Sequence, residues 1–199
     1  MGCYCIIVTG IPASGKSTLA KELGKRLDLP VFSKDEVKER LYDTLGFQSR
    51  EEKIRLGIAA MNIMYDIAEQ MMKCGKPFLL ENNFENESKD GLIRILKAYC
   101  CKVLTITLTG DYQVIYQRFV KRNTSPDRHR GHVVNDCYPE KVPLKEASLL
   151  SYQDFTEGIK TRGMDRFTIN GPSLRIDTTD FVNLDIEKIL KWIDKNREE

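Results

Sequence analysis

Along the chain, short runs of consecutive apolar residues alternate with longer segments in which apolar residues recur at regular intervals. Apolar runs of strand length occur at residues 3–9, 29–33, 77–84, 102–108 and 173–177. Between them apolar positions recur every three or four residues, which predicts amphipathic helices. These helices are expected at residues 17–27, 34–41, 49–72, 89–98, 111–119, 144–152 and 186–193. Strands that alternate with helices predict an α/β fold, with a parallel, doubly wound sheet and helices on both faces.

A glycine-rich segment joins the first predicted strand to the first predicted helix. It reads GIPASGKST and has the G-x-x-x-x-G-K-[ST] spacing of a phosphate-binding loop. In such a loop the backbone N–H groups and the helix dipole point at one anion, the lysine adds a charge at the phosphates, and the serine hydroxyl can ligate Mg²⁺. We therefore expect ATP and Mg²⁺ as cofactors. The predicted nucleotide-binding residues are Gly10, Ile11, Pro12, Ala13, Ser14, Gly15, Lys16, Ser17 and Thr18.

Three carboxylates follow predicted strands, at the sheet edge where parallel sheets bind their ligands. Asp35 is predicted to accept the proton of an acceptor hydroxyl, with stabilisation of a helix N-terminus as the alternative. Glu81 ends an apolar strand, where a charge needs a partner, and either Mg²⁺ or an ion pair with Lys16 or an arginine would supply one. Asp111 follows Gly110 at a helix start, and a helix cap is the favoured interpretation.

A basic segment, RFVKRNTSPDRHRGH, begins at Arg118 and runs into a polar, proline-punctuated region. Arginine supplies planar donors that suit phosphate oxygens. We predict a small basic lid at about residues 123–147, with Arg128 and Arg130 as catalytic cations, and a solvated basic loop is the alternative. The whole chain has 31 Lys and Arg against 29 Asp and Glu. This balance favours no nucleic-acid partner, so any basic site must be local.

The length of 199 residues suits one domain, and residues 1–199 are predicted to form a single P-loop domain with the lid inside it. No apolar run approaches the length of a membrane span, and no basic segment precedes a signal-like core. The six cysteines show no zinc-site spacing, so free thiols in a reducing compartment are expected. We therefore expect a cytoplasmic protein without a membrane partner, and its oligomeric state stays open.

Four segments, GIPASGKST, FSKDEVKERL, LLENNF and RFVKRNTSPDRHRGH, occur in this order. Together they resemble the AAA-type ATP-binding P-loop kinases grouped with chloramphenicol phosphotransferase, zeta toxins and polynucleotide hydroxyl-end kinases. The resemblance spans most of the chain and implies an adenylate-kinase-like core of five parallel strands. It implies that Asp35 matches the aspartate that activates the acceptor. It also implies that Arg118 and Arg122 lie near the adenine or the phosphates, with Arg128 and Arg130 in the lid.

The sequence departs from this resemblance at two places. The third strand ends in Glu81, Asn82 and Asn83, where many relatives carry Asp followed by a small residue or Thr. Asn82 and Asn83, with Asp35, are the predicted substrate residues, and Ser17 with Glu81 are the predicted metal ligands. Residues 42–50 take no part in this resemblance, which leaves the acceptor open.

The leading functional hypothesis is an ATP-dependent kinase that transfers the γ-phosphoryl group to a hydroxyl of a small molecule. A kinase for polynucleotide or tRNA hydroxyls is a second hypothesis, and the balanced charge and the lack of an aromatic-rich basic sheet face argue against it. A nucleotide-binding switch or ATPase without a phosphate acceptor is a third hypothesis, from a different class. Asp35 has no obvious role in such a switch or ATPase.

Overall fold

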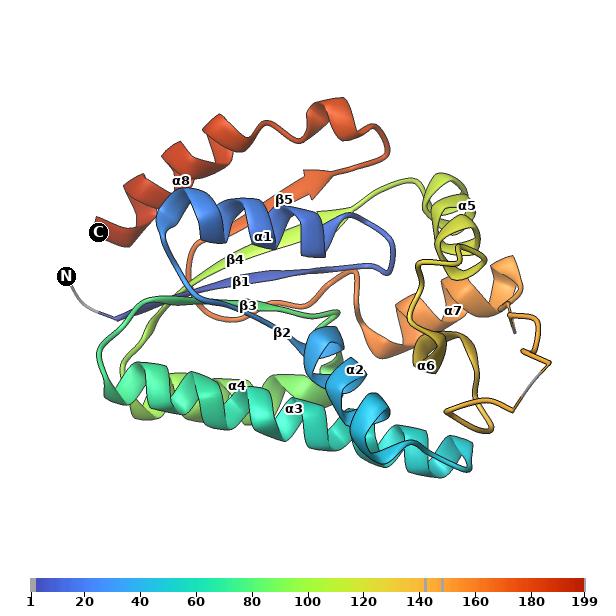
Figure 1. Ribbon diagram of the computed structural model, residues 1–199. Coiled ribbons are helices and arrows are strands. Elements are labelled where there is room, and N and C mark those ends of the chain that lie inside the picture. Colours follow the sequence, from blue (N-terminus) through green and yellow to red (C-terminus); the bar gives the residue numbers. More distant parts are fainter. Residues whose placement is uncertain (1–2, 142, 148, 199) are drawn as a thin grey trace.

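The computed structural model (Figure 1) describes residues 3–141, 143–147 and 149–198. Its centre is a sheet of five parallel strands in the order β2-β3-β1-β4-β5. The strands are β1 (Tyr4–Gly10), β2 (Val31–Ser33), β3 (Phe78–Glu81), β4 (Lys102–Thr109) and β5 (Ser173–Asp177). The predicted parallel, doubly wound sheet is confirmed.

Helices connect the strands and cover both faces of the sheet (Figure 1). They are α1 (Lys16–Leu27), α2 (Lys34–Leu45), α3 (Arg50–Lys73), α4 (Asn86–Ala98), α5 (Tyr112–Asn123), α6 (Arg130–Val133), α7 (Tyr152–Arg162) and α8 (Ile186–Glu198), with a 3₁₀ turn η1 (Phe181–Asn183) before the last. In Figure 1, α1 and α8 lie on one face of the sheet, and α3 and α4 lie on the other. Helices α5, α6 and α7 lie beyond the carboxyl ends of the strands. No helix among the described residues is long and apolar enough to cross a membrane.

The central strand β1 is buried along its whole length because it contributes side chains to two cores. Ile7 packs with the apolar residues of α3 and α4, whereas Ile6 packs with those of α1 and α8. Burying one such side chain stabilises the fold by about 1.5–3 kcal/mol. This two-sided burial explains why β1 reads as a continuous apolar run, and it fixes the carboxyl end of β1 firmly in the sheet.

The helix predicted at residues 144–152 is wrong. The described residues of this range before Tyr152 are not helical, and α7 begins only at Tyr152, with the Ser151 side chain accepting a hydrogen bond from the Asp154 N–H at 3.1 Å. Leu144 is 62 % exposed, so it has no apolar surface that would hold it in a helix. In contrast, Phe155 and Ile159 of α7 are buried against an apolar cluster with residues of α5. Tertiary burial therefore decides where this helix lies.

The segment predicted as a lid lies against α2 and α3. Lys53 of α3 donates hydrogen bonds to the Val134 carbonyl and, at 3.1 Å, to the Asn135 side chain. Phe47 and Tyr138 pair through both of their backbone hydrogen bonds, each at 2.8 Å. Residues 134–138 of this segment are thereby tied to α3 and to the loop that follows α2.

Candidate functional site

The loop between β1 and α1 is shaped by glycines. Gly10 ends β1 at a φ of 131°, and a Cβ atom there would lie 1.9 Å from the Leu108 carbonyl oxygen of β4. Gly15 adopts a φ of 94° directly before α1. Side chains at either position would meet both backbone strain and a steric clash. Only glycine therefore lets the chain leave β1 and start α1 within this short loop.

Lys16 is buried at the start of α1, and its Nζ donates to the Ile11 carbonyl at 2.8 Å. Burial lowers the Lys16 pKa to about 8, an effect that Glu81 opposes and Arg122 reinforces. The ammonium group therefore lies over the loop in an environment that favours an additional anion.

Glu81 is buried at the end of β3, in register with Ser33 of β2. The Ser33 hydroxyl donates to Glu81 Oε2 at 2.6 Å. Burial raises the Glu81 pKa, whereas Lys16 and hydrogen bonds from Ser33 and Ser17 lower it. Ser17 and Glu81 thus bring a hydroxyl and a carboxylate oxygen together at the loop, and both are ligands that Mg²⁺ prefers.

The oxygen ligands at the loop are too few to enclose a metal ion by themselves, but they suit Mg²⁺ that is also bound by phosphates and water. Among the described residues, no group of three or more His, Cys, Asp or Glu side chains could hold a metal ion. Mg²⁺ is commonly bound by one or two protein groups together with water and substrate phosphates. Ser17 and Glu81 match that pattern.

A cavity of about 300 Å³ opens beside the loop. Its lining residues are Ala13, Gly15, Lys16, Ser17, Thr18, Arg118, Arg122 and Phe181. Arg118 donates to the carbonyls of Thr178 at 2.5 Å and Thr179 at 2.8 Å, and its guanidinium lies 3.9 Å from the centre of the Phe181 ring. Arg118 and Arg122 thus lie beside the phosphate-binding loop, and their contact with the adenine or the phosphates stays a prediction.

Arg122 supplies an independent indication of an anion. Its Nε is buried and has no hydrogen-bond partner among the described residues. Burial lowers the Arg122 pKa to about 10, and the neighbouring Arg128 adds to this effect. A buried donor without a partner is costly, and phosphate oxygens would satisfy it.

Asp35 lies in the first turn of α2, with its side chain 48 % exposed. Lys38 Nζ lies 3.7 Å and Arg128 NH2 4.0 Å from its carboxylate oxygens. Although burial acts in the opposite direction, Lys38, His132, Arg128 and Arg122 hold the Asp35 pKa well below its usual range. The carboxylate is ionised at physiological pH, and an anion that neutralised these cations would raise its pKa.

The two lid arginines differ in their surroundings. Arg128 faces Asp35, and its buried Nε has no hydrogen-bond partner among the described residues. Arg130 instead donates two hydrogen bonds of 2.6 Å to Glu140 and one of 2.7 Å to the Lys145 carbonyl. The structure therefore brings Arg128 to Asp35 and leaves Arg130 paired within the segment that was predicted as a lid.

The remaining predicted residues lie around the end of β3. The Asn82 N–H donates to the Val8 carbonyl at 3.3 Å, and its side-chain amide lies 3.6 Å from the Met61 sulfur of α3. Asn82 and Asn83 are half-buried. Asp111, in contrast, caps α5 and accepts from the N–H groups of Gln113 and Val114 at 3.0 Å, as the favoured interpretation predicted.

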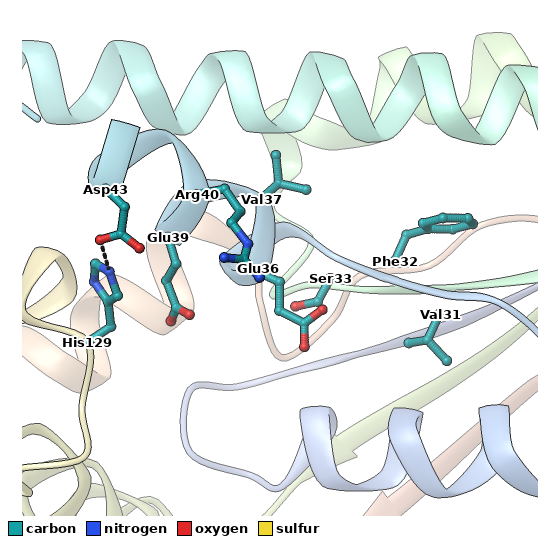
Figure 2. A pocket seen from close by; sticks show the side chains of 9 residues that line it. All are labelled: Val31, Phe32, Ser33, Glu36, Val37, Glu39, Arg40, Asp43 and His129. Carbon is teal, nitrogen blue, oxygen red and sulfur yellow. Dashed lines mark hydrogen bonds and ion pairs between the residues drawn. The ribbon is translucent and has the colours of Figure 1, made fainter. Parts of the chain in front are cut away.

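Helix α2 also borders a cavity of about 560 Å³ whose polar lining is largely acidic (Figure 2). Glu36, Glu39 and Asp43 line it, and His129 reaches from the lid segment to Asp43 with an Nε2–Oδ1 distance of 2.9 Å (Figure 2). Carboxylates disfavour an anionic ligand. This side of α2 is therefore unsuited to phosphate groups.

Sequence reasoning did not single out Phe181. Its ring lies where a Cβ on Gly15 would meet it at 2.9 Å, and it is 47 % exposed. The available signal was an aromatic residue four positions after the end of the last predicted strand. That signal was too weak to interpret without knowledge of where the segment lies in the fold.

The strand order and the phosphate-binding loop define an adenylate-kinase-like P-loop NTPase. The sequence profile of the AAA domain family AAA_18 matches residues 6–138, and the chain belongs to this family. Family membership implies ATP binding.

Solved structures extend the comparison. A candidate kinase from Chloroflexus aurantiacus J-10-fl has 28 % identity and a TM-score of 0.81, with 98 % of this chain and 99 % of that chain covered. The fold is also that of a gluconokinase from Sinorhizobium meliloti 1021, with 10 % identity, a TM-score of 0.53 and coverage of 95 % and 88 %. An APS kinase from Mycobacterium tuberculosis, solved with AMPPNP and APS, has 15 % identity, a TM-score of 0.56 and coverage of 97 % and 98 %. The chain therefore shares its fold with a gluconokinase and an APS kinase, and it is similar in sequence and fold to the candidate kinase.

Proposed function

We propose that the protein is an ATP-dependent kinase that transfers the γ-phosphoryl group to a hydroxyl of a small-molecule acceptor. The observation that carries this proposal is the position of Asp35. An ionised carboxylate lies 4.0 Å from Arg128 and within the electrostatic reach of Lys16. The loop and the cations can hold the phosphates but cannot accept a proton, whereas a carboxylate among the cations can take the proton of an attacking hydroxyl group.

Each group has a distinct task in this proposal. The backbone N–H groups of residues 15–18 at the start of α1, with Lys16 and Arg122, hold the β- and γ-phosphates, while Arg118 and Phe181 border the base. Mg²⁺, held by Ser17 and Glu81, would neutralise charge on the phosphates when bound. Asp35 orients the acceptor hydroxyl and takes its proton as the oxygen bonds to the γ-phosphorus. The bond from the γ-phosphorus to the bridging oxygen breaks, and ADP leaves with the electron pair.

The direct test is a screen of ADP formation across a panel of alcohols, including sugars, sugar acids and aminoglycoside-like compounds. We expect ATP turnover to depend on one class of added alcohol, with one phosphorylated product formed for each ADP. Turnover at the same rate without any alcohol would instead support an ATPase. Phosphorylation of 5′-hydroxyl RNA or DNA, but of no small alcohol, would support the polynucleotide alternative.

Replacing the two lid arginines separately should separate their roles. Arg128→Ala is expected to lower kcat by roughly 10²–10³-fold, because a preorganised cation beside the reacting groups is lost. Arg130→Ala is expected to retain most of kcat and to lower the melting temperature, because it breaks the contacts with Glu140 and Lys145. Steady-state kinetics and thermal denaturation of both variants provide the measurement. An equally large loss of kcat in both variants would support the sequence-based assignment of Arg130 as catalytic.

Glu81→Gln is expected to raise the Mg²⁺ concentration needed for half-maximal rate, because an anionic oxygen ligand becomes a neutral one. Ser33→Ala is the matched control, since it removes the 2.6 Å hydrogen bond to Glu81 and keeps the carboxylate charge. Magnesium titrations of both variants provide the measurement. An unchanged titration for Glu81→Gln, with reduced thermal stability alone, would favour an electrostatic partner for Lys16 over a metal ligand.

A further inference from the structure

A further cavity of about 560 Å³ lies between α2, α3, the start of α4 and the end of α7. Lys34, Lys38 and Tyr42 line it, and their spacing of four residues places them on one face of α2. Glu36, Arg40 and Asp43 line the cavity of Figure 2 and fall on the other side of the helix. Helix α2 thus separates two cavities of similar size and opposite charge character.

Cations dominate the charged lining of this further cavity. The basic residues are Lys34, Lys38, Arg50, Lys53 and Arg162, and the acidic ones are Glu85 and Glu87. Arg162 pairs with Glu85 at 3.3 Å. Among the described residues, Lys34 has no ion-pair or hydrogen-bond partner, although Lys38 lies one turn away. Like charges at this spacing destabilise a helix. Glu85 and Asp35 oppose the charge of Lys34 only through their fields, so the described lining keeps an excess of positive charge.

The protonation behaviour of these lysines agrees with that excess. Burial lowers the Lys34 pKa, and the neighbouring Lys38 adds to the effect. Burial also lowers the Lys53 pKa to about 8, with Lys38 and Arg50 contributing. Both ammonium groups would gain from an anion in the cavity.

Two further features of the cavity indicate what other groups its ligand would carry. Tyr42 is fully buried and lines the cavity, and its hydroxyl has no hydrogen-bond partner among the described residues. Ile54 and Ile58 of α3 also line the cavity and are 52 % and 57 % exposed. A ligand that covers these isoleucines and offers a polar atom to Tyr42 would satisfy both groups.

We propose that this cavity binds the phosphate acceptor and that the acceptor is an amphipathic anion, a hydroxyl compound with a carboxylate or phosphate group beside an apolar body. This inference rests on the proposed kinase function. Lys38 links the two sites, because it lines the cavity while its Nζ lies 3.7 Å from Asp35 Oδ1. An acceptor bound with its anionic group at Lys34 and its apolar body on Ile54 and Ile58 can extend its hydroxyl toward Asp35.

Binding is tested without turnover, in protein saturated with AMPPNP and Mg²⁺ so that the phosphate loop is occupied. Calorimetry compares 1-naphthyl phosphate, 1-naphthoate and uncharged 1-naphthol. We expect the anions to bind roughly 10- to 100-fold more tightly than 1-naphthol. The anion that binds more tightly identifies whether the cavity prefers a phosphate or a carboxylate group.

The variant Lys34→Gln should weaken binding of the anions by a similar factor and leave 1-naphthol unchanged. Arg40→Gln is the matched control, since it removes one positive charge from the opposite side of the same helix. Equal affinities for the anions and 1-naphthol, or equal effects of the two variants, would overturn the proposal. Turnover of neutral alcohols alone would overturn the assignment of an anionic acceptor and leave the kinase function standing. Lys34-dependent anion binding without turnover of any alcohol, neutral or anionic, would instead overturn the kinase function and leave an anion-binding cavity.

Discussion

Asp35→Asn is expected to lower kcat by roughly 10²–10⁴-fold with the preferred acceptor. The substitution keeps the size of the side chain and removes both the charge and the proton acceptor. Affinity for ATP should change little, because the Gly10–Thr18 loop and Lys16 are untouched. Steady-state kinetics, together with binding of a fluorescent ATP analogue, measures the two effects separately.

Glu36→Gln is the matched control for this substitution. Glu36 is the next residue of α2, carries the same charge and pairs with Lys21 at 2.9 Å on the exposed surface. The kcat of the Glu36→Gln variant should remain close to that of the wild type. A collapse of ATP binding in Asp35→Asn, with normal turnover at saturating ATP, would assign Asp35 to the metal site or to the fold. Equal losses in both variants would point to the negative charge at the start of α2, where acidic residues stabilise a helix.

Lys16→Ala is expected to lower kcat by roughly 10²–10³-fold and to weaken ATP binding as well. The reason is that the buried ammonium is a fixed charge positioned over the phosphate loop, where water cannot replace it. Lys21→Ala is the control on the same helix, since Lys21 is exposed and pairs with Glu36. Kinetics of the folded variants give the comparison. Wild-type turnover in Lys16→Ala would contradict the kinase mechanism.

The Lys16 pKa of about 8 adds a pH-dependent test of the same contact. Phosphates favour the charged lysine, so ATP binding should raise this pKa and take up a proton. The apparent ATP affinity should therefore fall as the pH rises through 8. Calorimetry in two buffers of different ionisation enthalpy measures the proton uptake. If ATP binding took up no proton at pH values around 8, Lys16 would not contact the phosphates.

The sequence alone determined the features that depend on local physics. Two-sided burial makes a strand such as β1 continuously apolar, and a turn with positive φ between strand and helix needs Gly10 and Gly15. The helix cap at Asp111 was likewise readable, because a cap involves only neighbours along the chain. The rule that ligands lie at the carboxyl ends of parallel strands then placed Asp35 and Glu81 at one edge.

Only the tertiary structure decided which charges are neutralised and which cavities they line. Arg128 and Arg130 look equivalent in the sequence, yet one faces Asp35 and the other pairs with Glu140. Phe181 reaches the phosphate loop, and Lys34 and Arg162 line one cavity, through contacts between segments far apart in the chain. The start of α7 depended in the same way on apolar surface supplied by α5. The energy of a charge or an apolar side chain depends on the groups around it, and these are set by the packing of distant elements rather than by sequence neighbours.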